Sequence, residues 1–206
     1  MYHDGQFDDA RMAISLALTA DQEGATLLNY FEVTGLKKEN NMLTGVQVKD
    51  RIKGTTHTVK AKVIINATGV FSDEVIRLDQ PDAKPMIRPS QGVHLVIDKS
   101  FLQENHAIMV PHTTDGRVLF AVPWNGQVVV GTTDTPVDHA LEEPLAMEEE
   151  IDFILENASA YMTKKPSRKD VKSVFTGLRP LSVNEGKKES TKEVARHHKI
   201  IVSTSG

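Results

Sequence analysis

Residues 117–131 read Arg-Val-Leu-Phe-Ala-Val-Pro-Trp-Asn-Gly-Gln-Val-Val-Val-Gly, and this stretch carries the clearest fold signal in the chain. Apolar residues lie on both sides of Asn125-Gly126, a dipeptide typical of the two-residue turn of a β-hairpin. We therefore expect antiparallel strands over residues 117–124 and 127–131. Further short strands are predicted around this hairpin, at residues 93–98, 107–110, 171–175 and 200–203.

Two amphipathic helices flank these strands. Asp8 is a suitable N-cap for the first, whose apolar residues recur at helical spacing until Gly24. The second spans residues 147–162 and has one apolar face. Its first turn contains Glu148-Glu149-Glu150, which we interpret as a solvated turn favoured by the helix dipole and not as a carboxylate pair.

The N-terminal part predicts a small meander of strands. Residues 25–33 are rich in aromatic and β-branched types, and residues 43–50 and 55–61 alternate around Lys53-Gly54. Residues 63–65 predict a short buried strand, and Ser72 is expected to cap a short helix through Leu78.

The amino-acid composition changes at Pro81, Pro85 and Pro89. Three prolines in nine residues favour an extended linker, so we expect a domain boundary there. The predicted fold class is α+β, with a mostly antiparallel β-sheet domain and flanking helices at residues 81–206. Residues 1–80 form the other predicted domain.

The composition excludes several classes of protein. The 206 residues include 24 Lys and Arg against 28 Asp and Glu, so no basic field for nucleic acid is expected. The absence of cysteine excludes disulfides and thiolate chemistry. No run of 18 apolar residues occurs, and the first residues do not resemble a signal peptide.

Two glycine-containing turns are candidates for ligand contact. The chain has neither G-x-G-x-x-G nor G-x-x-x-x-G-K, so neither phosphate loop is present. Asn66-Ala67-Thr68-Gly69 follows a predicted strand and is either a ligand-facing turn or an ordinary strand-to-helix turn. Gly131-Thr132-Thr133-Asp134 either orients a ligand or satisfies the backbone of a sharp turn.

Charged residues between apolar neighbours are the remaining candidates. Arg179, in Gly-Leu-Arg-Pro-Leu, is expected to be partly buried and to need an anion, either a ligand or an internal carboxylate. Arg196 is interpreted in the same way, with more exposure. His94 lies within a predicted strand as either a structural residue or an acid–base group. His197-His198 cannot form a metal pair, since neighbours on a strand face opposite ways, and no metal site is predicted.

In this order, the segments resemble the FAD-dependent, quinone-linked glycerol-3-phosphate dehydrogenases. The matching segments cover essentially the whole chain: Asp8-Asp9-Ala10-Arg11, Ile65-Asn66-Ala67-Thr68-Gly69, Gly92-Val93-His94-Leu95-Val96, Val122-Pro123-Trp124, Gly131-Thr132-Thr133-Asp134, Gly177-Leu178-Arg179-Pro180-Leu181 and Arg196-His197-His198. The ordered set is far more specific than any one segment.

The resemblance implies an architecture and a set of site residues. Residues 1–80 would be a partial FAD-binding domain with a small β-meander, and residues 81–206 a substrate-binding domain with a truncated return to the FAD domain. His94 and Arg179 would be catalytic, and both would bind substrate together with Arg196. The cofactor-binding residues implied are Ala67, Thr68, Gly69 and Thr132.

The implied reaction oxidises sn-glycerol 3-phosphate to dihydroxyacetone phosphate, with FAD and a quinone acceptor. The implied location is cytoplasmic, with peripheral association at the inner face of the cell membrane. The alternatives are a glycerol-3-phosphate oxidase, an amine or amino-acid oxidase of the same wider fold, and a non-catalytic ligand-binding domain. We expect this chain to be an internal fragment that, without the dinucleotide loop, neither retains FAD nor turns over substrate.

Overall fold

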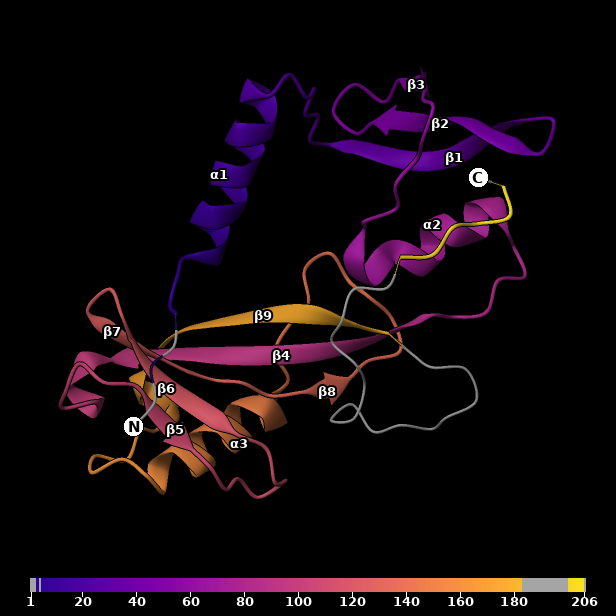
Figure 1. Ribbon diagram of the computed structural model, residues 1–206. Helices are drawn as coiled ribbons and strands as arrows, with labels where there is room; N and C mark the ends of the chain where they lie inside the picture. The colour runs from indigo at the N-terminus through magenta and orange to yellow at the C-terminus, as the bar shows by residue number, and fades with distance from the viewer. Residues whose placement is uncertain (1–2, 4, 183–199, 206) are drawn as a thin grey trace. The chain divides into compact units, whose positions relative to one another are not determined.

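The computed structural model describes residue 3, residues 5–182 and residues 200–205 (Figure 1). The α-helices and strands are α1 Asp9–Gln22, β1 Phe31–Glu39, β2 Met42–Asp50, β3 Thr56–Lys60, α2 Ser72–Asp79, β4 Ile87–Asp98, β5 Ile108–Val110, β6 Leu119–Trp124, β7 Gln127–Gly131, β8 Thr135–Pro136, α3 Glu148–Ser159 and β9 Val171–Ser182. Short 3-10 turns are η1 Gly69–Phe71, η2 Lys99–Phe101 and η3 Arg168–Asp170. The mixture of helices and antiparallel sheets confirms the predicted α+β class.

The chain divides into two compact units, Met1–Ile64 with Thr204–Gly206, and Ile65–Ser203. In the first unit, β1, β2 and β3 form an antiparallel sheet in that order. The backbone N–H of Arg11 donates to the Asp8 carboxylate, which confirms the predicted N-cap of α1. The hairpin around Lys53-Gly54 is also confirmed, because β2 pairs with β3 from Gly45↔Lys60 to Lys49↔Thr56.

The first strand begins later than predicted. The segment before Phe31 is not strand, and Tyr30 has a φ of 59°, which interrupts extended backbone. The strand then continues through Lys37 and Lys38 because it pairs with β2 over its whole length. Tertiary pairing therefore overrides the weak strand propensity of these lysines.

The second unit is built on a six-stranded antiparallel sheet in the order β5-β6-β7-β4-β8, with β9 pairing along the other side of β4. Figure 1 shows β4 and β9 side by side over most of their length. The predicted hairpin is confirmed: Trp124 pairs with Gln127, and Asn125 and Gly126 have φ values of 45° and 74°. Two positive φ angles are those of a type I′ turn.

The core of this unit lies between the sheet and α3. Val93, Leu95 and Ile97 alternate along β4 toward this face and are at most 1% exposed. Ile154 and Ala158 of α3 belong to the same cluster, at most 1% exposed. The spacing that predicted an apolar helix face is thus confirmed, and the strand alternation determines which face of the sheet is covered.

Two predicted strands are absent from the described residues. Residues 63–65 and 200–203 contain no regular structure, and Val63, Ile65, Ile200 and Val202 are more than 70% exposed. Apolar, β-branched composition favours a strand only when a partner strand supplies hydrogen bonds. Both segments lack a paired strand among the described residues, which accounts for the error.

The proline segment differs from the predicted linker. Pro89 lies inside β4 opposite Pro180 of β9, a position where neither residue needs to donate a ladder hydrogen bond. The boundary between compact units falls between Ile64 and Ile65. Assignment of residues 1–80 and 81–206 to cofactor-binding and substrate-binding domains stays a prediction. Among the described residues, no helix has both the length and the apolar composition needed to cross a bilayer.

Candidate active site

The face of β4 and β9 opposite the apolar core carries two of the predicted site residues, His94 and Arg179. Cross-strand partners share a face of a sheet, and β4 pairs Ser90↔Arg179, Gly92↔Gly177 and His94↔Phe175. His94 and Arg179 therefore lie on the same face, opposite the one that carries Val93 and Leu95. We call the side of the sheet that carries Ser90, Gly92, His94, Gly131, Phe175, Gly177 and Arg179 the open face, where Ser90, Gly92 and Gly131 are themselves buried.

His94 is held between a glycine and an aromatic ring. It pairs with Gly131 of β7, and a Cβ built on Gly131 would clash with the imidazole at Cδ2 and Cγ. Its ring also stacks on Phe175, with 4.9 Å between centroids and 9° between planes. A missing side chain on one strand and an aromatic ring on the other thus fix the imidazole on the open face.

Arg179 reaches across β4 in a similar way. A Cβ on Gly92 would lie 2.5 Å from both terminal nitrogens, so the guanidinium lies directly over that glycine. Nη2 donates to the Thr132 hydroxyl at 2.9 Å, and Nη1 donates to the Thr133 carbonyl at 3.1 Å. The Asp134 carboxylate lies 3.8 Å from Nη1. The internal carboxylate considered for Arg179 is therefore present, while 29% of the side chain remains exposed.

The turn at Asn66–Gly69 is exposed and internally braced. The Asn66 side chain accepts from the Thr68 amide and hydroxyl and donates to the Ser72 carbonyl. Gly69 has a φ of 60°, a conformation that favours glycine, and the space around its missing Cβ is open. The η1 turn that follows contacts β9 and β4, so the turn lies near these two strands of the sheet. Ser72 is the first residue of α2 and not its cap, one position from the prediction.

Glu150 corrects the interpretation of the acidic helix start. Glu148 and Glu149 are exposed, but Glu150 is only 5% exposed and accepts hydrogen bonds from Gln91, Thr133 and Thr135. Position three of a helix is where a glutamate reaches back to the backbone before the helix, and Met147 N–H donates to it here. That positional signal was available in the sequence, as was the unusual presence of Gly92 and Gly131 within predicted strands.

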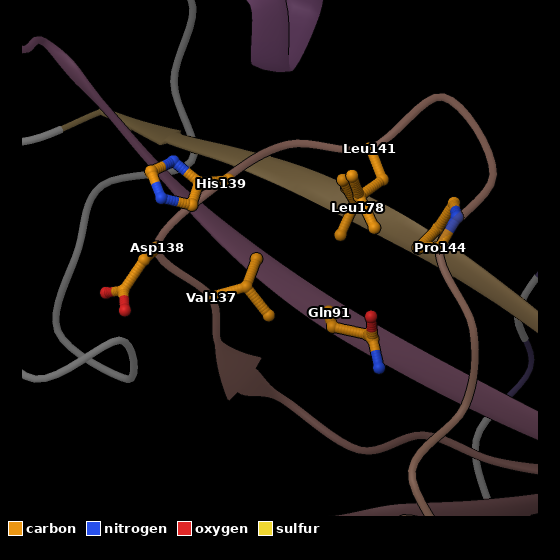
Figure 2. A pocket seen from close by; sticks show the side chains of 7 residues that line it. All are labelled: Gln91, Val137, Asp138, His139, Leu141, Pro144 and Leu178. Carbon is orange, nitrogen blue, oxygen red and sulfur yellow. The ribbon is translucent and has the colours of Figure 1, made fainter.

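Two hollows in the described structure are lined by residues other than those of the open face. One, of about 290 Å³, lies where residues 137–144 approach Gln91 and Leu178 (Figure 2). The other is lined by residues of the first unit, among them Phe31, Val48 and His57. Neither is lined by His94, Arg179 or Thr132, so the candidate site rests on the chemistry of the open face.

Other predicted residues fall elsewhere. Arg196, His197 and His198 lie outside the described residues. Within the described part of the chain, no group of three or more His, Asp or Glu side chains is arranged to hold a metal ion. The open face therefore carries His94 and Arg179, and the Thr132 hydroxyl accepts a hydrogen bond from the guanidinium. The exposed Thr68-Gly69 turn belongs to the same compact unit.

A profile of FAD dependent oxidoreductases matches residues 1–202. The chain belongs to the FAD dependent oxidoreductase family. This membership confirms the flavoprotein class and FAD as the cofactor of the family, both implied by the sequence resemblance.

Three similar proteins are glycerol-3-phosphate dehydrogenases. The chain is 39% identical over its whole length to a probable mitochondrial glycerol-3-phosphate dehydrogenase of Dictyostelium discoideum, of which it covers 34%. It is 40% identical to the mitochondrial glycerol-3-phosphate dehydrogenase of Homo sapiens, of which it covers 29%. A solved glycerol-3-phosphate dehydrogenase of Bacillus halodurans, complexed with FAD, has a TM-score of 0.78 and 37% identity over 85% of this chain and 36% of its own. The chain thus spans about a third of the relatives it matches.

The described residues fit contact with FAD at one place. The backbone of Ala67, Thr68 and Gly69 is exposed, and the absence of a Cβ at Gly69 leaves space for a flat ligand beside the turn. The Thr132 hydroxyl, by contrast, already hydrogen-bonds Arg179 and the Thr133 carbonyl. The turn therefore suits direct contact with the cofactor, and Thr132 suits orientation of the arginine.

Proposed function

We propose that this chain supplies the substrate-side residues of an FAD-dependent enzyme that oxidises sn-glycerol 3-phosphate to dihydroxyacetone phosphate. The observation that carries the proposal is the common face shared by His94 and Arg179, two residues 85 positions apart that β4 and β9 bring together. The glycerol-3-phosphate dehydrogenases to which the chain is 39–40% identical support the same choice of substrate.

The chemistry requires a proton acceptor and a positive charge. Oxidation of the C2 alcohol breaks the C–H bond and the O–H bond and forms a carbonyl; FAD, when bound, supplies the oxidant that takes the hydride. His94 is the proposed base for the hydroxyl proton, since imidazole titrates near neutral pH. Arg179 is the proposed cation that stabilises negative charge developing on the oxygen.

The remaining residues complete the proposed site. Arg196 binds substrate, with the phosphate group as its target, because a guanidinium matches phosphate oxygens bidentately. Ala67, Thr68 and Gly69 lie against FAD, and Thr132 contributes on the cofactor side by orienting Arg179. In this proposal residues 1–80 belong to the cofactor-binding part and residues 81–206 mainly to the substrate-binding part.

The electron acceptor in this proposal is a quinone, reached from a peripheral position on the inner face of the cell membrane. An oxidase would instead pass the electrons to oxygen. The two are separated by measuring quinone reduction and hydrogen peroxide release with the same flavin-loaded preparation. Quinone reduction without peroxide supports the proposal, and peroxide formation with no quinone reduction supports an oxidase.

The test of the substrate uses a flavin-loaded protein that contains this chain, mixed anaerobically with glycerol 3-phosphate. We expect the visible absorbance of oxidised flavin to disappear, and Arg179→Ala or His94→Ala to slow this about 10²- to 10⁴-fold. Arg168→Ala and His106→Ala are matched controls. Both residues have partners outside the open face: Arg168 forms ion pairs with Glu148 and Asp152, and the His106 ring contacts the Glu104 carboxylate. Equal losses in controls and site variants, or no bleaching by glycerol 3-phosphate, would contradict the proposal.

A further inference from the structure

Glu150 is a carboxylate buried on the far side of the sheet from His94 and Arg179. It lies in the first turn of α3 and is 5% exposed. Removing a carboxylate from water costs several kcal/mol unless hydrogen bonds replace the lost hydration. Its position therefore requires a specific set of donors.

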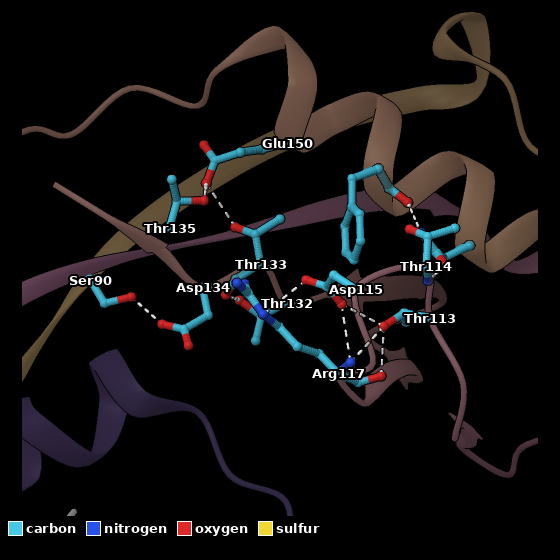
Figure 3. Close-up of polar contacts among 12 residues, drawn as sticks. Ser90, Thr113, Thr114, Asp115, Arg117, Thr132, Thr133, Asp134, Thr135 and Glu150 are labelled. Atoms are coloured by element: carbon cyan, nitrogen blue, oxygen red, sulfur yellow. Dashed lines mark hydrogen bonds and ion pairs between the residues drawn. The ribbon is translucent and has the colours of Figure 1, made fainter. Parts of the chain in front are cut away.

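Four donors surround the carboxylate. Oε1 accepts from the hydroxyls of Thr133 at 2.9 Å and Thr135 at 2.7 Å. Oε2 accepts from Gln91 Nε2 at 2.7 Å and from Met147 N at 3.0 Å. Figure 3 shows Glu150 directed at Thr133 and Thr135, with Asp134 and Ser90 beyond them. The donors come from β4, from the segment after β7 and from the helix start.

Thr133 connects this carboxylate to Arg179. Its hydroxyl donates to Glu150 and accepts from the Val93 amide at 2.9 Å, so its side chain is fixed on the core side of the sheet. Its carbonyl accepts from Arg179 Nη1 at 3.1 Å. The residues on either side of it, Thr132 and Asp134, lie beside the same guanidinium. Residues 132–134 therefore contact Arg179 as one segment, and Glu150 anchors that segment from behind.

We propose that Glu150 is a positioning residue, which holds the guanidinium of Arg179 in its reactive orientation through residues 132–134. The effect that we expect on the rate of glycerol 3-phosphate oxidation rests on the proposed function. A neutral residue that accepts fewer hydrogen bonds cannot hold both threonines and Gln91 at once, so the segment shifts and Arg179 shifts with it. Misplacement of a reacting group by about 1 Å costs up to about 10²-fold in rate.

The experiment compares Glu150→Ala, Glu150→Gln and Glu149→Ala in the flavin-loaded enzyme, with rates normalised to bound flavin. Glu149 is exposed in the same helical turn and serves as the matched control. We expect kcat/KM for glycerol 3-phosphate to fall about 10- to 100-fold in Glu150→Ala, to recover partly in Glu150→Gln, and to stay unchanged in Glu149→Ala. Glu150→Gln keeps the side-chain shape and gives the answer if Glu150→Ala does not fold.

A double-mutant cycle distinguishes positioning from a general loss of stability. If Glu150 acts through Arg179, the Glu150→Gln substitution causes no further loss in an Arg179→Ala background, because coupled residues are not additive. The same additional loss in both backgrounds would overturn the proposal, as would a wild-type kcat/KM per bound flavin for both Glu150 variants.

A structural readout separates this inference from the proposed substrate. The ¹⁵N-labelled Arg179 side-chain resonance is expected to move in Glu150→Gln and not in Glu149→Ala. If it moves but the wild-type enzyme does not oxidise glycerol 3-phosphate, positioning stands and the proposed function fails. If the enzyme is active and the resonance is identical in all three proteins, the function stands and positioning fails.

Discussion

The two faces of the β4–β9 region carry different kinds of side chain. On the covered face, Val93, Leu95 and Ile97 are buried to at least 99% against α3 and its neighbours. Gly92 and His94 alternate with these residues along β4 and lie on the open face. Gly131 of β7 pairs with His94 on that face. Side chains on one face of β4 therefore stabilise the fold, and those on the other face are candidates for the chemistry.

The difference lies in where side-chain volume is placed. Large apolar groups fill the covered face, whereas glycine on the open face leaves room for the side chain of a neighbouring strand to lie flat. Arg179 uses the space over Gly92, and His94 uses the space over Gly131. A functional surface can thus be made by omitting side chains from a strand, at a cost in strand propensity that the covered face offsets.

The largest expected effect comes from shortening a buried side chain on the covered face. Leu95 is fully buried, so Leu95→Ala should lower the free energy of unfolding by about 2–5 kcal/mol through lost burial and the cavity left behind. His94→Ala, one residue away on the open face, should cost no more than about 1 kcal/mol. Urea unfolding of both variants measures the contrast. Equal destabilisation would show that the two faces do not divide stability and chemistry in this way.

Adding a methyl group to the open face should have an intermediate effect. Gly92→Ala and Gly131→Ala are expected to displace Arg179 and His94 and to lower kcat/KM about 10- to 100-fold in the flavin-loaded enzyme. Gly177→Ala is the matched control, because Gly177 pairs with Gly92 on the same face but has nothing within 4 Å of its missing Cβ. A loss in Gly177→Ala as large as in Gly92→Ala would contradict the role of these close approaches.

The smallest effect is expected at the exposed end of β4. Lys172 donates to Asp98 at 2.6 Å, and this bond, with the Ser100 amide, holds the pKa of the Asp98 carboxyl well below its usual range. A lowered folded-state pKa stabilises the protein above the unfolded value of about 3.9, and the contribution disappears as the pH falls through the folded pKa. Asp98→Asn should therefore flatten the acid limb of the stability curve below about pH 5, with little effect on kcat/KM. An unchanged acid limb would show that this surface pair contributes nothing.

The sequence predicted local features of the fold well and pairing less well. The Asn125-Gly126 turn and the Asp8 cap follow from short-range chemistry and were confirmed. The strands expected at residues 63–65 and 200–203 were wrong, because composition alone does not supply a partner strand. The length of β9 was missed for the related reason that pairing with β4 carries the strand past Gly177 and Pro180.

In the candidate site, the residues that face a ligand were easier to predict than the residues that hold them in place. The setting of Arg179 between apolar neighbours predicted partial burial beside an anion, and Asp134 lies 3.8 Å away. Glu150 was interpreted as solvated because it stands in a run of three acidic residues, and only the fold shows that one of them turns inward to meet Thr133 and Thr135. The roles of His94, Arg179 and Thr132 stay predictions until tested.

The most direct test of the open face is a titration of the 206-residue chain with glycerol 3-phosphate, followed by NMR with labelled histidine, arginine, leucine and valine side chains. The account predicts that the resonances of His94 and Arg179 move together with one dissociation constant, while the methyl groups of Val93 and Leu95 on the covered face do not. Saturable shifts confined to residues near the hollow at Gln91 and Leu178, or no movement of either His94 or Arg179 at saturating ligand, would contradict it.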